Sequence, residues 1–263
     1  MRTLQRVGAG LFALTLFVGL AACGDDDDDA DDGAEATDEG DQAAGDNAFC
    51  DAVVEFNSAV FQVDISEDSS KEDIKAQGAD IAPLFQTITD EAPEELADDA
   101  NELNATIQAL TEGDAEAFNS DATFEQYTAF VDGAIGECDF DTTDVTAVDY
   151  SYEGVPETIE AGTVAFTFTN EAESEDHMMA IIKKKDGVDL TFEELLDLPE
   201  DEAESSTEFK GEAFAPAGES SSTLAELDAG EYAMICFIGV GSPEVEDGPP
   251  HFTQGMMQEF TVE

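Results

Sequence analysis

The sequence predicts a multidomain protein of α and β class, with an N-terminal antiparallel helical bundle followed by an antiparallel β-sandwich. Between residues 48 and 140, apolar residues recur at spacings of three and four, which is the period of an amphipathic helix. From residue 143 to 263 the pattern changes to short alternating runs separated by turns rich in Gly, Pro and Ser, which indicates strands. The first 47 residues consist of an apolar stretch followed by an acidic run.

Residues 1–22 have the composition of an export signal. Two arginines precede an apolar stretch that is short for a membrane span and ends in small residues. The junction Leu20-Ala-Ala-Cys23 resembles the bacterial lipobox, in which the cysteine becomes the lipidated first residue of the mature protein. We therefore expect lipid on Cys23 and a protein anchored to the cell membrane on its extracytoplasmic face. The alternative is a soluble secreted protein in which Cys23 carries no lipid.

Residues 23–47 are predicted to form an acidic, disordered tether. They include five consecutive aspartates and no large apolar residue, so folding them would bury too little surface to offset the lost chain entropy. Like charges extend such a segment. The tether would hold the folded domains away from the membrane.

The net charge of −57, from 65 acidic and 8 basic residues, limits the partners of this chain. Self-repulsion of this size destabilises a compact state, and salt screens it, so the composition predicts a halophilic protein. No nucleic-acid partner is expected, because a polyanion would be repelled. The acidic surface could alternatively steer a cationic partner toward the protein.

Four amphipathic helices are predicted within residues 48–140. Breaks at Asp68-Ser-Ser, at Ala92-Pro and at Gly113-Asp separate them, and the short turns favour an up-down-up-down bundle. The apolar stripes expected to face its interior are, in chain order, Phe49, Val53, Phe56, Val60 and Val63; Ile74, Ile81, Phe85 and Ile88; Leu96, Ala100, Leu103, Ile107 and Leu110; and Phe124, Tyr127, Val131 and Ile135.

Cys50 opens the first predicted helix and Cys138 closes the last one. In an up-down-up-down bundle these two ends can lie at the same pole, and the space outside the membrane permits disulfides. We therefore expect a Cys50–Cys138 disulfide, with two free thiols as the alternative.

The second domain, residues 143–263, contains short runs of strand character. These runs are 145–152, 163–169, 178–182, 222–227, 232–238 and 260–262. Several short strands joined by turns favour an antiparallel β-sandwich. One helical insert is predicted at residues 191–198, packed against the side or edge of the sandwich.

The chain contains only two histidines, His177 and His251, and both lie beside predicted strands of the second domain. Cys236 lies between them, and Met256 follows His251 by five residues. Two imidazoles, one thiol and one thioether form the ligand set of a blue-copper centre. These four residues are therefore the candidate metal ligands.

The order of these motifs resembles that of the cupredoxins, the plastocyanin-like copper proteins, from residue 143 onward. The matching features are Gly162 and a strand before Asn170 and His177, then Gly230-Glu-Tyr232 before Cys236, then His251, Gly255 and Met256 before the last strand. The resemblance implies a cupredoxin-like β-sandwich that binds one copper ion and transfers electrons. It also implies that Met256 is the axial ligand, that Asn170 ties the two ligand loops together, and that a redox partner docks at the His251 edge.

One departure from the family is the spacing of Cys236 and His251, because plastocyanin-like sites place the second histidine only a few residues after the cysteine. Here fourteen residues, 237–250, intervene, and we expect them to make the site looser, wetter or vacant. Met257 is a second candidate for the axial position. Cys236 could instead be a buried, inert thiol. The alternative function is then a copper-free cupredoxin-fold module for binding or interaction at the cell surface.

The sequence predicts no enzymatic activity. It shows neither a Ser-His-acid set nor a Gly-rich phosphate loop. The expected partners are the membrane, through lipid on Cys23, and a redox protein.

Overall fold

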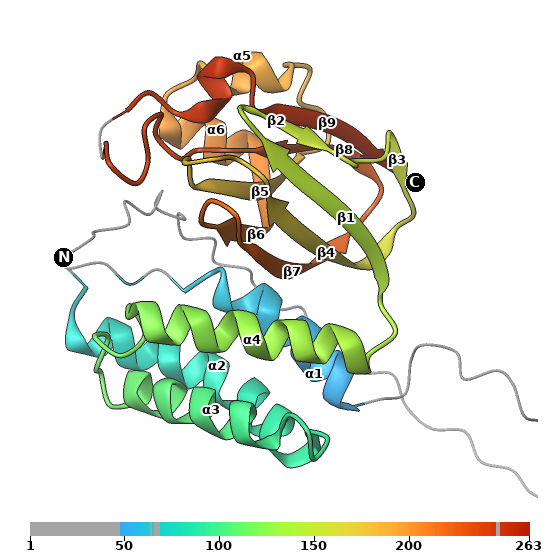
Figure 1. Ribbon diagram of the computed structural model, residues 1–263. Coiled ribbons are helices and arrows are strands. Elements are labelled where there is room, and N and C mark those ends of the chain that lie inside the picture. The colour runs from blue at the N-terminus through green and yellow to red at the C-terminus, as the bar shows by residue number, and fades with distance from the viewer. Residues whose placement is uncertain (1–47, 64, 66–68, 246–247) are drawn as a thin grey trace, which may run out of the picture.

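The computed structural model describes residues 48–63, 65, 69–245 and 248–263, which form a helical layer beneath a β-sandwich (Figure 1). The predicted signal peptide, the lipid on Cys23 and the tether 23–47 lie outside the described residues. Within the described part of the chain, no helix combines the length and apolarity that a bilayer span requires.

Four helices form the lower layer, as the periodicity predicts. They are α1 (Ala48–Val60), α2 (Lys71–Glu91), α3 (Ala97–Thr111) and α4 (Asp121–Glu137). Local side chains set two of their starts, because Ser70 and Asp73 form a capping box on α2 and the Ser120 hydroxyl accepts the Thr123 N–H at α4. The predicted disulfide between Cys50 and Cys138 is present, so α1 begins beside the end of α4.

The apolar stripe predicted for α4 is partly wrong. The buried side chains are Phe130, Val131 and Ala134, whereas Phe124 is 41 % exposed. The reason is that α4 packs against two partners, the other helices and the β-sandwich. The ring of Phe124 lies edge-on to Phe214 of the sandwich, with a centroid distance of 6.0 Å.

Within the described residues, the sandwich contains nine strands in two sheets. They are β1 (Asp141–Val148), β2 (Ser151–Glu153), β3 (Thr158–Ile159), β4 (Gly162–Asn170), β5 (His177–Lys184), β6 (Thr207–Ala215), β7 (Ser220–Leu227), β8 (Gly230–Ile235) and β9 (Met257–Val262). One sheet has the order β2-β1-β4-β7 and the other β3-β9-β8-β5-β6. The sheets are mixed rather than purely antiparallel, because β1 pairs with β4, and β3 with β9, in parallel. Strands β1 and β4 can pair in parallel because the chain crosses to the other sheet between them, where it forms β3.

Strand β6 and two short helices complete the second domain. Helix α5 (Phe192–Leu196) lies within the predicted insert, but α6 (Glu200–Ser206) and β6 were not predicted. The inward positions of β6 are Gly211, Ala213 and Ala215, which are small, and the alternate positions include charged residues. Such a strand gives little apolar alternation for a sequence pattern to detect.

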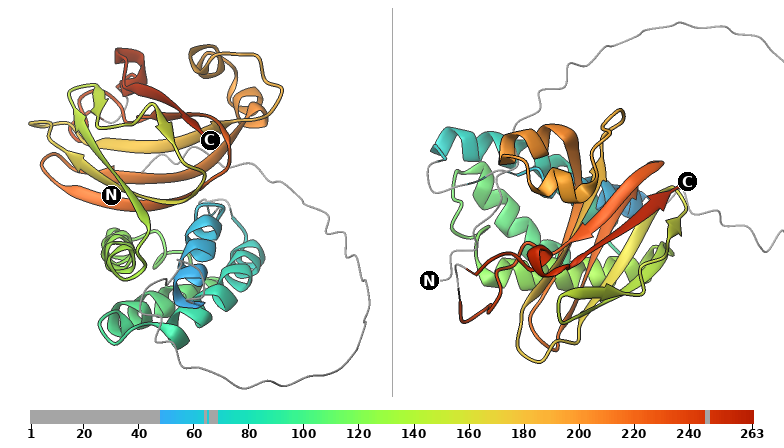
Figure 2. Two further views of the ribbon diagram at one scale, coloured as in Figure 1. Left: turned by 90° about the vertical axis from the view of Figure 1, so that its right-hand side faces the viewer. Right: turned by 90° about the horizontal axis from the view of Figure 1, so that it is seen from above.

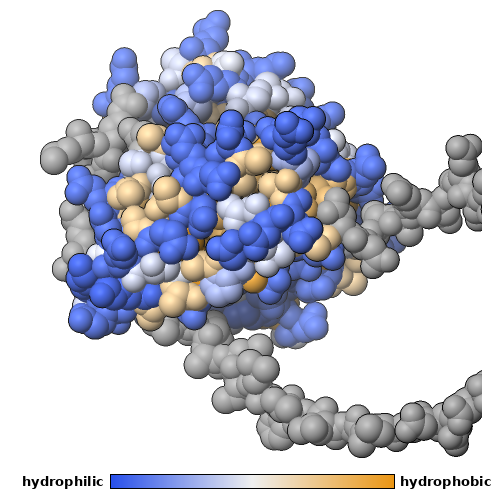
Figure 3. Space-filling model, turned by 90° about the horizontal axis from the view of Figure 1, so that it is seen from below, coloured by the Kyte–Doolittle hydropathy of each residue, from blue (hydrophilic) through white to orange (hydrophobic). Residues whose placement is uncertain are grey.

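The helices cover the outer face of the β2-β1-β4-β7 sheet (Figures 1 and 2). Strand β4 shows this in its alternation, because Val164 and Phe166 face the sandwich interior whereas Ala165 joins the core of the helical layer. Buried Asn57 of α1 donates from Nδ2 to the Leu224 carbonyl of β7 at 2.7 Å. Seen from below, mostly hydrophilic side chains cover the molecule, with smaller apolar areas between them (Figure 3).

Candidate metal centre

Three neighbouring strands of the five-stranded sheet bring the candidate ligands to one end of the sandwich. His177 is the first residue of β5, Cys236 directly follows β8, and His251 opens the 3-10 turn that leads into β9. Because β5 and β9 both run antiparallel to β8, the start of β5, the end of β8 and the start of β9 lie at the same end of the sheet.

The side chains of His177, Cys236 and His251 converge in the protein interior. All three are 0 % exposed. The Nδ1 atoms of the two histidines are 3.0 Å apart, and Cys236 Sγ lies 4.0 Å from His177 Nδ1 and 3.4 Å from His251 Nδ1. Together they form a group of possible metal donors within 4.8 Å of one another. Two sheets packed face to face with this triad at one end form the cupredoxin-like arrangement that the resemblance implies.

Burial keeps all three groups neutral near pH 7 when no metal is bound. Desolvation, followed by the charge of His251, lowers the pKa of His177 to about 4. Desolvation likewise lowers the pKa of His251 and raises the pKa of the Cys236 thiol to about 11. A metal ion bound here would displace the thiol proton, since the thiolate is the ligand form.

The hydrogen bonds of the cluster indicate which ring nitrogens carry protons. His251 Nε2 lies 3.2 Å from a Glu175 carboxylate oxygen, which places the proton of the neutral His251 ring on Nε2. The proton in the short Nδ1–Nδ1 contact then belongs to His177, which leaves His177 Nε2 unprotonated. That nitrogen is buried and has no hydrogen-bond partner among the described residues. Once the His177 proton moves to Nε2, both Nδ1 atoms and the Cys236 sulfur form a nitrogen and sulfur donor set that fits a copper ion.

Met256 and Met257 lie on opposite sides of the sheet. Met256 is fully buried in the same core cluster as Cys236, and its backbone carbonyl accepts the Cys236 N–H at 3.2 Å. Met257 instead packs in the cluster that contains Phe192 and Ile235. The fold therefore places Met256 beside the metal site and turns Met257 away from it.

Asn170 differs from the role that the resemblance implies. Its Nδ2 donates to the carbonyls of Glu175 and Ala215, each at 2.9 Å, and its Oδ1 accepts the Ala172 N–H at 3.0 Å. These bonds fasten the loop before His177 to β6 rather than to the segment of Cys236. The Cys236 sulfur instead accepts the Met178 N–H at 3.4 Å.

The insert 237–250 does not loosen the site as the sequence led us to expect. Its described residues, 237–245 and 248–250, fold back on one another, because Gly239 pairs with Pro250 and the Val240 N–H donates to the Pro249 carbonyl at 2.9 Å. The two halves approach so closely that a Cβ on Gly248 would lie 2.0 Å from the Val240 oxygen. His251 is consequently buried, and the expectation that its edge is open to a docking partner is wrong.

Sequence reasoning missed Glu175, which is the residue that closes this edge. Its Oε2 accepts from the Gly241 N–H at 2.8 Å and faces His251 Nε2, and its Oε1 accepts from the Tyr150 hydroxyl at 3.0 Å. Partial burial raises the pKa of Glu175, but hydrogen bonds from Gly241, Tyr150 and His251 outweigh it, so the pKa is lowered. Glu175 is one of several acids in its loop, and nothing in the sequence distinguishes it from them.

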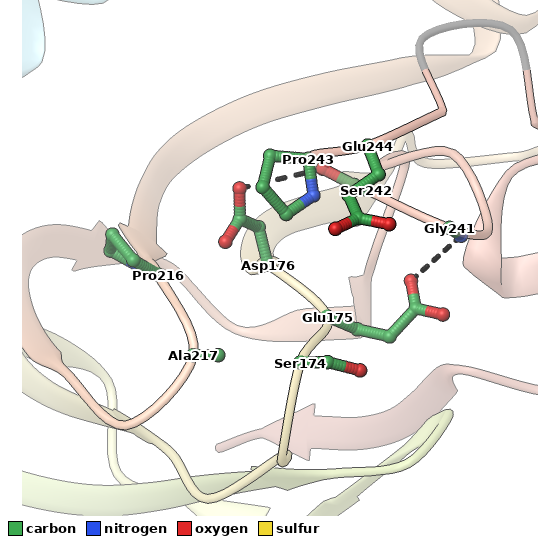
Figure 4. Close-up of a pocket in the computed structure, with 9 residues that line it drawn as sticks. All are labelled: Ser174, Glu175, Asp176, Pro216, Ala217, Gly241, Ser242, Pro243 and Glu244. Atoms are coloured by element: carbon green, nitrogen blue, oxygen red, sulfur yellow. Dashed lines mark hydrogen bonds between the residues drawn. The ribbon is translucent and has the colours of Figure 1, made fainter.

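A surface hollow of about 490 Å³ lies beside Glu175 (Figure 4). Its walls are the loop that contains Ser174 and Asp176, the turn at Pro216, and the insert from Gly241 to Glu244. None of the three buried donor residues lines it.

No family model matches the chain, and a search of curated proteins finds no match. Among solved structures, a dithionite-reduced auracyanin from the photosynthetic bacterium Roseiflexus castenholzii is 20 % identical, over 46 % of this chain and 96 % of that chain, with a TM-score of 0.31. Auracyanin A, a blue copper protein from Chloroflexus aurantiacus, is 17 % identical over 46 % and 98 %, with a TM-score of 0.31. A multicopper oxidase is 12 % identical over 47 % and 44 %, with a TM-score of 0.26. These TM-scores are too low to assign a family, and the metal centre rests on the side chains described above.

Proposed function

We propose that this protein is an electron carrier that binds one copper ion through His177, Cys236 and His251, and that the sulfur of Met256 would be a fourth ligand. The observation that carries the proposal is the burial of two imidazole nitrogens and one sulfur within 4.8 Å of one another. The rival, a copper-free module, would leave this donor set without a use, and it fits best with an outward-facing His251. The fold turns His251 inward.

The polypeptide holds the donor side chains in fixed positions and shields them from water. When bound, copper would supply the exchange of one electron between its Cu(I) and Cu(II) states. The sheet holds His177 and Cys236 in fixed register, and the Met178 N–H donates to the Cys236 sulfur at 3.4 Å. Such a bond to the ligating sulfur tunes the reduction potential. We favour a carrier over an enzyme because the donor residues are buried and do not line the adjacent hollow.

We further propose that the protein works at the extracytoplasmic face of the cell membrane, anchored by lipid on Cys23. The lipobox-like junction and the acidic segment after it support this placement. A redox partner with a basic surface is the matching partner for a chain of net charge −57. Nucleic acid is not a partner in this proposal.

The proposal predicts that purified protein turns intensely blue on addition of one equivalent of Cu(II), because a thiolate ligand absorbs strongly in the visible. Cys236→Ser removes the thiolate and should abolish the colour, whereas Met257→Leu should retain it, since Met257 packs on the other side of the sheet. The measurement is a visible absorption titration of the three proteins. A colourless wild type, or a blue Cys236→Ser variant, would refute the copper site.

A further inference from the structure

Glu175 joins three segments of the chain at the edge of the metal centre. The carboxylate accepts hydrogen bonds from the Gly241 N–H of the insert and from the Tyr150 hydroxyl of the turn after β1. It also faces His251 Nε2, which belongs to the segment before β9. The Tyr150 and His251 rings pack edge to face with centroids 5.0 Å apart. The carboxylate side chain is only 18 % exposed, so the contact with His251 is largely shielded from water.

These contacts set the orientation of the His251 ring. A carboxylate accepts hydrogen bonds, so the neutral imidazole facing it carries its proton on Nε2. The Nδ1 lone pair then points at Cys236 Sγ and His177 Nδ1, where a metal ion would lie. Carboxylate–histidine–metal arrangements of this kind orient the ligand and raise its basicity.

The carboxylate also explains how a long insert can coexist with a closed site. Fourteen residues separate Cys236 from His251, and the Gly241 N–H of this insert donates to the same Glu175 oxygen that faces His251, at 2.8 Å. One carboxylate oxygen of Glu175 therefore links the insert to His251. The Nε2 atom of His251 therefore contacts a carboxylate that is largely shielded from water, rather than solvent.

We propose that Glu175 is a positioning residue of the metal centre, which holds His251 in its metal-binding tautomer and links the insert to it at Gly241. This inference rests on the proposed copper site. Because the carboxylate adds a negative charge next to one ligand, it stabilises Cu(II) more than Cu(I), and the reduction potential is lowered relative to a site without it.

The test is Glu175→Gln, which keeps the size of the side chain and removes the charge. Loss of such a partner typically weakens metal binding by about 10–100-fold. We expect the dissociation constant for Cu(II) to rise at least tenfold more than that for Cu(I). A tenfold change in this ratio corresponds to a rise of about 59 mV in the midpoint potential, measured by redox titration.

Glu173→Gln is the matched control, because Glu173 is an exposed acid of the same loop. It removes the same charge and should leave the potential and both dissociation constants near those of the wild type. Equal shifts of the midpoint potential in the two variants would show that Glu175 acts only through its contribution to the overall charge, which would overturn the proposal. A blue wild type with an unchanged Glu175→Gln variant would overturn it as well while leaving the copper site standing.

A second measurement needs neither copper nor a variant. With only two histidines, nitrogen-15 NMR of the metal-free protein can assign the tautomer of each ring. We expect His251 to carry its proton on Nε2, hydrogen-bonded to Glu175. A His251 proton on Nδ1 would refute the positioning role, whereas a wild type that fails to bind copper would refute the proposed function and leave this result intact.

Discussion

At the residue scale, the centre consists of neutral groups placed where ionic ones would be costly. His177 is fully buried, and its Nε2 has no hydrogen-bond partner in the described part of the chain. Burial disfavours the charged imidazolium, and the nearby His251 disfavours it further. The metal-free protein therefore carries an acid-sensitive group in its core.

This sensitivity predicts that the metal-free protein loses stability between pH 6.5 and pH 4. The pKa of His177 is lowered from 6.5 to about 4 in the folded state, so the unfolded chain binds a proton that the folded chain does not. The contribution is complete above pH 6.5 and is lost as the pH falls toward 4, a difference of roughly 3 kcal/mol. Urea unfolding at pH 7 and pH 4.2 measures it.

The control for this prediction is His177→Asn, which does not titrate in this range. The many carboxylates contribute alike to both proteins, so the difference between their pH dependences isolates His177. If the variant lost as much stability as the wild type on acidification, another group would be responsible.

At the element scale, the contact between helix α1 and strand β7 connects the two layers. Asn57 is 1 % exposed, donates to the Leu224 carbonyl, and accepts a short hydrogen bond from the Tyr127 hydroxyl of α4. One side chain therefore joins α1, α4 and β7. Desolvation, followed by the charge of Glu212, raises the pKa of Tyr127 well above its usual value, so its hydroxyl remains a donor.

Asn57→Leu should lower the free energy of unfolding by about 2–4 kcal/mol, because it takes a hydrogen-bond partner from two buried polar groups. Copper binding should be unaffected, since the change lies away from the metal centre. Glu55→Ala, at an exposed position of the same helix, should change stability by no more than about 0.5 kcal/mol. Chemical denaturation of the three proteins measures this, and an Asn57→Leu variant as stable as the control would contradict the role of this contact.

At the scale of the whole molecule, the metal centre and the start of α1 lie at opposite ends. Strand β1 begins three residues after Cys138 and runs toward Tyr150, which packs on His251. Its eight residues span roughly 25 Å. The first described residues of α1 therefore lie at the end of the molecule remote from the metal centre.

The charge of the whole molecule predicts a strong dependence of stability on salt. With a net charge of −57, repulsion opposes the compact state and screening relieves it, since the screening length falls from about 30 Å at 0.01 M salt to about 3 Å at 1 M. We expect the midpoint of thermal unfolding to rise steadily from 10 mM to 1 M NaCl, measured by calorimetry.

Glycerol at the osmolality of the lower salt concentrations is the control, because it does not screen charge. An unfolding midpoint that stays constant over this salt range would contradict the expectation that repulsion limits the stability of this fold.

Local features of the sequence were enough to predict the helical part, the strand-rich part that follows it, and the four candidate donors. Hydrophobic period and capping depend on neighbours within a few residues, so they can be read along the chain. The stripe of α4 and strand β6 could not be predicted in full. Helix α4 packs against both the other helices and the β-sandwich, and the inward positions of strand β6 are Gly211 and two alanines.

Only the tertiary structure decided that His177 and His251, 74 residues apart, bring their Nδ1 atoms within 3.0 Å. It also decided which methionine packs in the core cluster of Cys236 and which acid faces His251. These outcomes depend on how strands pair and how the insert closes, and such contacts between distant segments leave no period in the chain. The residue types were therefore enough to predict the metal chemistry, whereas only the packing shows that Glu175, and not a neighbouring acid, contacts His251.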